Sequence, residues 1–454
     1  MEIFERLIVD FSNWLWGMPL LILLLGGGLY FVIYSNFIPF KYFGHAIDVL
    51  RGKYDDPHDP GQINHYEALS TALAATVGMG NISGVAVAIT TGGPGAIFWM
   101  WVSAIIGIAT KFFTCTLAIM YRGKDTFGEI QGGPMYVITE GLGRKWRPLA
   151  VFFSVAGMIG VLPIFQANQF TQILRDVLLV PNGIEGSFKT NLITGFIITI
   201  VVSLVIFGGI KRIGKVAGKM VPMMVVLYFA SVFYILLANF DAVPASFVLI
   251  FKDAFTGDAV LGGALGAIII AGARRAAFSN EAGIGTAPMA HGAAKTVEPV
   301  REGLVAMLGP FIDTIVVCTL TALAILITGT WQDSESGGVT VTVNAFAQAI
   351  PVTGIYILML CVTIFATTSF FSYSYYGTKC LSFIAGAKYK NLFNYFYVGS
   401  IVFGSTASLA SIISLIDASY ALMSIPTMIS AILLSPKVKK EAKKYFKALE
   451  SDKK

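Results

Sequence analysis

Two stretches of the sequence place glycine and polar residues in the middle of long apolar runs. The first is Ala-Ala-Thr-Val-Gly-Met-Gly-Asn-Ile-Ser-Gly at residues 74–84, and the second extends over residues 271–285. A glycine inside a helix weakens it by about 1 kcal/mol relative to alanine, and unpaired peptide groups in hydrocarbon are more costly still unless they line a cavity. Both stretches are therefore predicted to be broken helices beside a ligand site.

The interruptions define the chemistry that such a site can perform. Free N–H groups where a helix restarts carry a partial positive charge that suits a carboxylate, and free carbonyl groups on the other half suit a cation. A zwitterionic amino acid carries both charges, so one broken helix can bind it while Na⁺ takes oxygens nearby. Residues 78–81 contain no acid or base. Proton-driven carriers more often use a titratable group, so sodium is favoured over protons.

Other polar residues in apolar runs could complete this site. Thr368 and Ser369 could supply hydroxyl oxygens to an ion, or they could bond back to their own helix. Residues 165–169, Phe-Gln-Ala-Asn-Gln, place three amides in about one turn of helix. Gln166 and Asn168 are predicted to bond the substrate, with hydrogen bonding between helices as the alternative.

Charged residues also fall within apolar runs. Arg274, Arg275 and Glu281 lie beside the second interruption and are predicted to pair with one another or to gate the cytoplasmic route. For Lys111 and Asp313 we expect only the structural role of pairing, because an isolated charge inside a membrane is costly.

The elements that must position these residues are membrane-spanning helices. Apolar residues make up 56% of the 454 positions and charged residues only 13%, whereas soluble domains contain about 25% charged residues. Runs of about 20 apolar residues predict one all-α integral membrane domain over the whole chain, 1–454, with no soluble domain. The eleven predicted spans are 14–40, 66–90, 95–121, 148–174, 190–210, 216–239, 259–285, 302–328, 352–384, 391–414 and 417–435.

The order of the spans predicts an inverted repeat. The two interrupted spans are the second and the seventh, five steps apart in the order, and because five is odd they enter the membrane from opposite faces. Residues 66–239 and 259–435 are predicted to form two repeats of five helices, with 14–40 as an extra N-terminal helix and 436–454 as a basic tail. Most Lys and Arg fall in alternate loops and in this tail. This predicts a cell-membrane protein with its N-terminus outside and its C-terminus in the cytoplasm.

Three motifs carry a resemblance to known transporters. Residues 76–82, Thr-Val-Gly-Met-Gly-Asn-Ile, are similar to the break in the first core helix of sodium-coupled amino-acid transporters with the bacterial leucine-transporter fold. Residues 92–101, Gly-Gly-Pro-Gly-Ala-Ile-Phe-Trp-Met-Trp, and 278–283, Phe-Ser-Asn-Glu-Ala-Gly, resemble the alanine or glycine:cation symporter family. These sodium/alanine symporters belong to the amino acid–polyamine–organocation superfamily, and the length and span number fit that family over the whole chain.

The resemblance implies roles for residues of the first interruption. The amides of Met79 and Gly80, with Gly78 making room, would receive the substrate carboxylate. Thr76 and Asn81 would approach the substrate or the ion.

A sodium site and further substrate contacts are implied in the same way. The sodium site would consist of the carbonyl groups of Ala74 and Val77, the side chain of Asn81, and the hydroxyls of Thr368 and Ser369. In the second interrupted span, the family pattern implies substrate contacts from Ala273, Phe278, Ser279 and Asn280.

The predicted function is secondary active transport by alternating access, with substrate and Na⁺ bound near the bilayer midplane. The residues indicate a small zwitterion, and the resemblance implies alanine and glycine, Na⁺ as coupling ion, and no other cofactor. A channel or facilitator and a proton-coupled carrier are the alternatives. The sequence contains no phosphate-binding loop, HExxH or GxSxG motif, which argues against an ATP-driven pump or an enzyme. The expected environment is membrane lipid without nucleic acid, as a monomer or weak oligomer.

Overall fold

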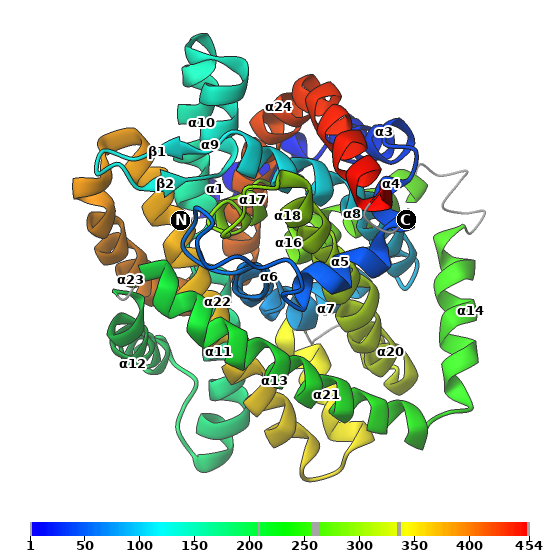
Figure 1. Ribbon diagram of the computed structural model, residues 1–454. Coiled ribbons are helices and arrows are strands. Elements are labelled where there is room, and N and C mark those ends of the chain that lie inside the picture. Colours follow the sequence, from blue (N-terminus) through cyan, green and yellow to red (C-terminus); the bar gives the residue numbers. More distant parts are fainter. Residues whose placement is uncertain (1, 208, 256–263, 334–336, 452–454) are drawn as a thin grey trace.

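The computed structural model describes residues 2–207, 209–255, 264–333 and 337–451. These residues are mostly helical, and the strands among them form one short antiparallel hairpin, β1 (Gly123–Lys124) and β2 (Ile130–Gln131). Figure 1 shows the helices packed side by side, with the hairpin at the left edge and α14 (Ala242–Ala254) at the right edge.

Six helical segments are long and apolar enough to cross a membrane, and two bent helix pairs bring this number to eight. This assignment rests on length and composition. The six segments are α8 (Ala96–Met120), the run Arg144–Asn182 that contains α10 (Arg147–Gly160) and α11 (Ile164–Leu174), α13 (Gly209–Ala238), the run Pro299–Thr328, α22 (Gly354–Ala385) and α24 (Leu409–Ser451).

The first bent pair replaces the predicted span 14–40. Helix α1 (Glu2–Leu15) ends at a turn, and a new helical run follows from Met18 to Tyr34 at an angle of 48°. The turn has two physical causes. Pro19 occupies the start of the new helix, where its missing N–H is harmless, and the indole N–H of Trp16 donates to the carbonyl oxygen of Asp417 at 2.9 Å. The predicted limits of the crossing at 14–40 stay a prediction.

The second bent pair is the predicted span 66–90. Helix α6 (His65–Thr76) and the helical run Gly80–Gly92 meet at 52°. This run consists of a π-helical segment (Gly80–Gly84) and α7 (Val85–Gly92). An Asn64 capping box starts α6, because its side chain accepts from the Glu67 amide at 2.7 Å. The predicted break in this span is confirmed.

The three remaining predicted spans coincide with shorter helices. These are α12 (Phe188–Ile206), α16 (Ala264–Asn280) and α23 (Lys390–Thr406). Residue 208 of span 190–210 and residues 259–263 of span 259–285 lie outside the described residues. Each of the eleven predicted spans thus contains helix, while the number of crossings and the inverted repeat stay predictions.

The second interruption lies at the C-terminal end of the predicted stretch 271–285. Helix α16 continues through Gly272 to Asn280, and the residues without helical structure are 281–286, before α17 (Ala287–His291). Glycine at position 272 serves close packing on α8 instead: an added Cβ would lie 2.5 Å from the Ala96 carbonyl oxygen and 2.6 Å from Trp99 Cβ. The break itself has positive φ at Glu281 (55°), Gly283 (84°) and Gly285 (106°).

The run Pro299–Thr328 is a helix of several parts. Helix α18 (Pro299–Ala306) and the short α19 (Leu308–Pro310) lead into a π-helical segment, Phe311–Cys318, which continues as α20 (Thr319–Thr328). Such wide turns are rare and frequently occur at functional sites. This segment contains Asp313.

Several shorter elements join these helices. They are α2 (Met18–Leu21), α3 (Gly27–Tyr34), α4 (Ile38–Lys41), α5 (Phe43–Leu50), α9 (Pro134–Tyr136), α21 (Val339–Ala349), the π-helical segments Ile22–Gly26, Val137–Leu142 and Arg175–Leu179, and the 3-10 turns Arg144–Trp146, Val180–Asn182, Thr330–Gln332 and Ala387–Tyr389.

The basic tail predicted at 436–454 is helical up to Ser451, as a continuation of α24. It packs against α5, where His45 bonds the Tyr445 hydroxyl at 2.7 Å.

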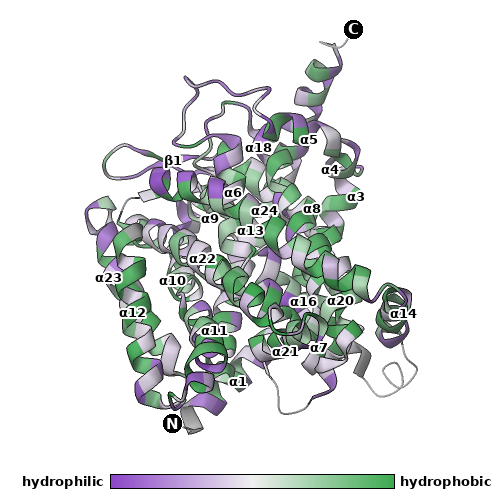
Figure 2. Cartoon of the chain, turned by 90° about the horizontal axis from the view of Figure 1, so that it is seen from below, coloured by the Kyte–Doolittle hydropathy of each residue, from purple (hydrophilic) through white to green (hydrophobic). Residues whose placement is uncertain are grey.

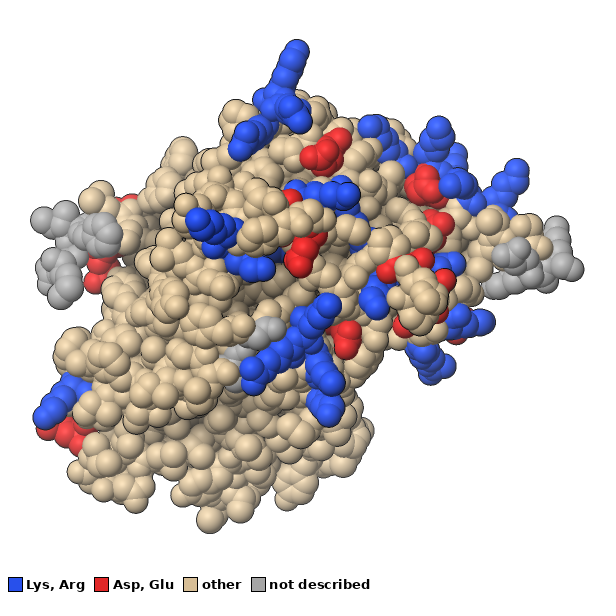
Figure 3. Space-filling model, turned by 60° about the vertical axis from the view of Figure 1, so that its left-hand side comes forward, with Lys and Arg blue, Asp and Glu red and all other residues tan. Residues whose placement is uncertain are grey.

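Figure 2 shows hydrophobic residues through the middle of the bundle and hydrophilic residues gathered at its ends and loops. On the face shown in Figure 3, Lys, Arg, Asp and Glu gather on the upper part and leave a broad lower area nearly free of charge. Both patterns are those of a protein surrounded by lipid.

The packing role of Gly272 can be tested with Gly272→Ala. Because the new methyl group would meet the backbone of α8, we expect the free energy of unfolding to fall by about 1–3 kcal/mol, the range for overpacking. The matched control is Gly266→Ala on the same helix, where an added Cβ meets nothing within 4 Å. It should leave stability unchanged or raise it. Thermal unfolding in detergent measures both, and equal effects would contradict the packing role.

Candidate functional site

The first interruption exposes peptide groups inside the bundle. Helix α6 ends at Thr76, and Val77 and Gly78 are not helical. The Gly78 amide donates to the side-chain oxygen of Asn81 at 2.9 Å. The amides of Met79 and Gly80 donate to no described residue. Two N–H groups at the start of a helix are therefore free for an anion.

Both glycines of the interruption lie against neighbouring helices. A Cβ on Gly78 would be 2.5 Å from the Ser369 hydroxyl oxygen of α22. A Cβ on Gly80 would be 3.2 Å from the Phe278 ring of α16. The interruption is thus enclosed by α22 on one side and α16 on the other, and both positions need the smallest residue.

The predicted sodium ligands gather where α22 meets the end of α6. Ser369 donates to the Ala75 carbonyl oxygen at 3.4 Å and to its own helix at the Phe365 oxygen, 3.1 Å away. Thr368 donates to the same Phe365 oxygen at 2.9 Å. Both hydroxyls therefore bond back to α22, and that of Ser369 also faces the carbonyl end of α6, where the predicted ligands Ala74 and the C-cap residue Val77 lie.

A buried carboxylate connects the two interruptions. The Asn81 amide donates to Asp313 Oδ1 at 2.8 Å and to the Asp313 carbonyl oxygen at 3.0 Å. Ser279, near the end of α16, donates to Asp313 Oδ2. All three side chains are fully buried. Asp313 was expected only to pair with a cation, so its role in the site was missed, although an acid inside an apolar run was the available signal.

The surroundings of Asp313 are polar as well. Thr314 donates to Asp313 Oδ2 at 2.9 Å and accepts from the Asn280 amide at 3.0 Å. The Lys111 side chain of α8 is also buried, and its predicted pairing with an acid stays a prediction. The first and second interruptions are thus parts of one hydrogen-bonded network.

Glu281 stabilises the second interruption. Its carboxylate accepts from the hydroxyls of Tyr373 at 2.6 Å, Tyr420 at 3.1 Å and Thr286. The predicted pairing of Glu281 with Arg274 and Arg275 was therefore wrong.

Both arginines instead bind Asp417 of α24. Arg274 reaches Asp417 Oδ2 at 2.6 Å, and Arg275 contacts the same oxygen. Arg274 also donates to Asn13 of α1 at 2.9 Å. The aspartate is 142 positions away in the sequence, so no local pattern could have identified it.

Phe278 packs between α11 and the first interruption. Its ring packs edge-on against Phe165, with centroids 4.8 Å apart, and it also lies against Gly80. The next residue, Gln166, is buried, and its side-chain oxygen has no hydrogen-bond partner among the described residues. A buried acceptor without a donor is a place for a ligand N–H group.

Two predicted site residues lie apart from this group. Asn168 donates to the carbonyl oxygens of Gly404 at 3.1 Å and Ala407 at 2.9 Å, at the end of α23. Ala273 lines a small cavity between α16, α8 and the first helical run, with Gly107 and Ala277. Thr76 lies at the site, with its hydroxyl bonded back to Ala72 at 3.2 Å.

Gln169 is the third amide of residues 165–169, and it was not among the two predicted to bond the substrate. Its side-chain oxygen accepts from the Val339 amide at 2.9 Å and from the Ser83 hydroxyl at 2.5 Å. It therefore connects α11 to the restarted first helix and to α21. Of the three amides at residues 165–169, this one contacts the restarted part of the first broken helix through Ser83.

Comparison with known proteins indicates which class of protein has this arrangement. A model of the sodium:alanine symporter family matches residues 1–454. The chain belongs to this family. The sodium/alanine symporter AgcS of Methanococcus maripaludis is 38% identical over 451 residues, which cover 97% of this chain and 97% of that protein. The probable sodium/glutamine symporter GlnT of Bacillus subtilis is 35% identical over 448 residues, which cover 98% of this chain and 91% of that protein.

The fold agrees with this family assignment. The crystal structure of MhsT in complex with L-phenylalanine matches with a TM-score of 0.59 at 14% sequence identity, over 84% of this chain and 98% of that chain. The fold is therefore like that of the leucine transporter, as the resemblance implied. This member of the sodium:alanine symporter family is a multi-pass membrane transporter and not an enzyme.

The bridging role of Asp313 predicts the effect of Asp313→Ala. Asn81 and Ser279 would each keep a buried donor without an acceptor, at about 1–3 kcal/mol for each group. We expect a clear loss of thermal stability in detergent. Asp48→Ala is the control, because Asp48 pairs with Lys53 at 3.9 Å on the surface and its loss should change little. A stable Asp313→Ala protein would contradict the bridge.

Proposed function

We propose that this transporter is a sodium-coupled symporter of small neutral amino acids, with alanine and glycine as substrates, and that it works by alternating access. The observation that carries the proposal is the pair of free amides at Met79 and Gly80, enclosed between Phe278 and α22. A helix start with bare N–H groups and no cationic side chain suits the carboxylate of a zwitterion.

The ammonium group of the substrate needs a hydrogen-bond acceptor. The buried side-chain oxygen of Gln166 lies one residue from Phe165, which packs on Phe278, and has no partner among the described residues. A substrate ammonium group would satisfy it. Because the Phe278 ring comes to 3.2 Å from a Cβ at Gly80, little room is left for a substrate side chain. This favours alanine and glycine over larger amino acids.

The ligands proposed for Na⁺ are uncharged oxygens. They are the carbonyl groups of Ala74 and Val77 and the hydroxyls of Thr368 and Ser369, with the Asn81 side chain beside them. The carbonyl end of α6 adds the negative end of a helix dipole. Such a site attracts a cation without itself carrying a charge. The family name and the sodium/alanine symporter AgcS support sodium as the ion.

Two cavities at opposite ends of α23 support alternating access. One, of about 250 Å³, lies at the end of α23 near Ala407 and is also lined by Asn168 and Arg175. The other, of about 560 Å³, lies at the start of α23 near Asn394 and is also lined by Lys379. Alternating access needs a route to the site from each side of the membrane in turn.

The proposal is tested by radiolabelled alanine uptake into proteoliposomes, with sodium, potassium and proton gradients imposed one at a time. Uptake that saturates and needs sodium supports the symporter. The proton arm is included because Asp313 supplies a buried carboxylate of the kind used by proton-driven carriers. Uptake driven by protons alone, or flux that rises linearly with the gradient as in a pore, would overturn the proposal.

Substrate access predicts the effect of side chains at Gly80. Gly80→Leu should abolish uptake, and Gly80→Ala should weaken alanine binding, because either side chain moves into the space between the free amides and Phe278. Gly84→Ala is the matched control, since its Cβ would be at an ordinary 3.7 Å from the same ring. Each variant must first be shown to reach the membrane in normal amount. Normal uptake by Gly80→Leu would exclude this glycine from the site.

A further inference from the structure

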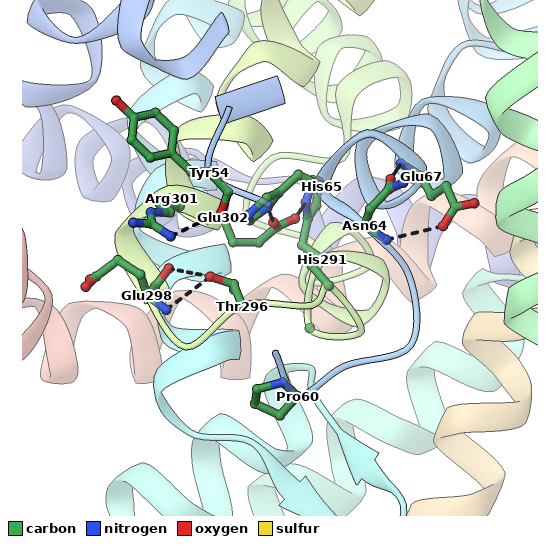
Figure 4. Close-up of polar contacts among 12 residues, drawn as sticks. Tyr54, Pro60, Asn64, His65, Glu67, His291, Thr296, Glu298, Arg301 and Glu302 are labelled. Atoms are coloured by element: carbon green, nitrogen blue, oxygen red, sulfur yellow. Dashed lines mark hydrogen bonds and ion pairs between the residues drawn. The ribbon is translucent and has the colours of Figure 1, made fainter. Parts of the chain in front are cut away.

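A buried cluster of two imidazoles and one carboxylate lies away from the substrate site. His65 Nδ1 contacts Glu302 Oε2, and His291 Nδ1 contacts Glu302 Oε1. All three side chains are at most 1% exposed. Figure 4 shows the two rings converging on the carboxylate from different elements. Each oxygen of the carboxylate therefore binds one histidine.

The three residues come from the elements that lead away from the two interruptions. His65 is the first residue of α6, His291 is the last residue of α17, and Glu302 lies in α18. The Glu302 carboxylate thus joins two segments. One is α6, which precedes the first break, and the other is α17, which follows the second break. Any movement that separates these segments must break one of the two contacts.

Main-chain contacts hold the same two segments together. We call residues 60–65 and 291–296 the seam. The Lys295 amide donates to the Ile63 oxygen at 2.7 Å, and the Gln62 amide donates to the Ala293 oxygen at 2.8 Å. The Arg122 guanidinium donates to Pro60 at 2.9 Å and to Thr296 at 3.1 Å. Gln62 also lines the larger cavity, so the seam borders the route on that side.

Both imidazoles retain a nitrogen that can take a proton. In the neutral ring one nitrogen is protonated, and here that proton belongs on Nδ1, which faces the carboxylate. The Nε2 atoms of His65 and His291 are buried and have no hydrogen-bond partner among the described residues. Within the described part of the chain, no group of His, Cys, Asp or Glu is arranged to hold a metal ion. The ligand that suits this cluster is the proton.

The charges around the cluster determine which of its protonation states is unfavourable while the seam is closed. Basic side chains near the cluster are Arg301 on α18, Arg122 after α8 and Lys379 on α22, whose Nζ donates to the Met289 oxygen two residues before His291. Other ionisable groups that face it are Asp55 in the loop after α5 and Cys115 on α8. The basic residues at the start of α13 are exposed.

One bound proton neutralises the cluster, because it gives one imidazolium and one carboxylate. A second proton leaves a net positive charge in a buried place that already has the Arg122 and Arg301 guanidinium groups nearby. Repulsion and desolvation both oppose that state as long as the seam is closed. Opening would let water reach the second imidazolium.

We propose that His65, Glu302 and His291 form a proton-binding latch that keeps the seam closed and releases it when both imidazoles are protonated. The sequence predicts that this end of the molecule is cytoplasmic, so the latch would make opening on that side depend on cytoplasmic pH. Only this consequence for transport rests on the proposed function. The latch itself is a property of the folded chain.

Hydrogen exchange measured by mass spectrometry on the full-length protein in nanodiscs tests the latch without substrate. Between about pH 7.5 and about pH 5.5, exchange in peptides covering the seam, corrected for intrinsic rates, should rise by about tenfold. In His65→Asn/His291→Asn the response should disappear and protection should persist. Asparagine keeps an N–H at the position of Nδ1 but takes up no proton. His58→Asn is the matched control, because His58 is exposed, and it should behave like the original protein.

Two results would overturn the latch: a wild-type seam whose exchange does not change with pH, or a pH response that survives in the double variant. If the double variant does not fold, the single variants decide, because each should remove the second protonation and abolish the response. Glu302→Ala should give high seam exchange at both pH values. These measurements need no uptake, so failure of the symport proposal would be seen separately.

Discussion

The arrangement of this protein depends on how one asparagine satisfies an interrupted helix inside the bundle. The side-chain oxygen of Asn81 accepts from the Gly78 amide, and its side-chain nitrogen donates to Asp313. Both atoms of this amide group therefore stabilise the turn between Gly78 and Asn81. In lipid there is no water to replace these bonds, and an unpaired peptide group is costly. With Gly78 satisfied by the side chain, the next two amides, of Met79 and Gly80, stay free for a ligand.

The π-helical segment at 311–318 provides the other side of this interaction. It presents both the Asp313 side chain and the Asp313 carbonyl oxygen to the Asn81 amide. In an ordinary helix that carbonyl group would be directed along the axis to a residue of the next turn. A wide turn therefore lets one residue bind the first interruption through two oxygens while its remaining oxygen accepts from Ser279 beside the second.

The first interruption could be predicted because two glycines and an asparagine fall within four residues of one apolar run. The second could not be placed, because a glycine in a membrane helix serves packing as readily as a break. Gly272 packs on α8, while the chain departs from helix at Glu281, a residue with φ of 55° held by three hydroxyl groups. The bridge through Asp313 joins residues 232 positions apart, so it depends on the tertiary fold and has no local pattern.

Each half of the second broken helix is held by a carboxylate, and the two halves bind different ones. In α16, Arg274 and Arg275 bind Asp417, and beyond the break His291 binds Glu302. The residues between these two attachments include three with positive φ, so the two halves are joined by a segment that no regular helix constrains. One half can therefore lose its carboxylate while the other keeps its own. The alternating access that we propose needs this independence, because a rigid continuous helix would release or hold both ends together.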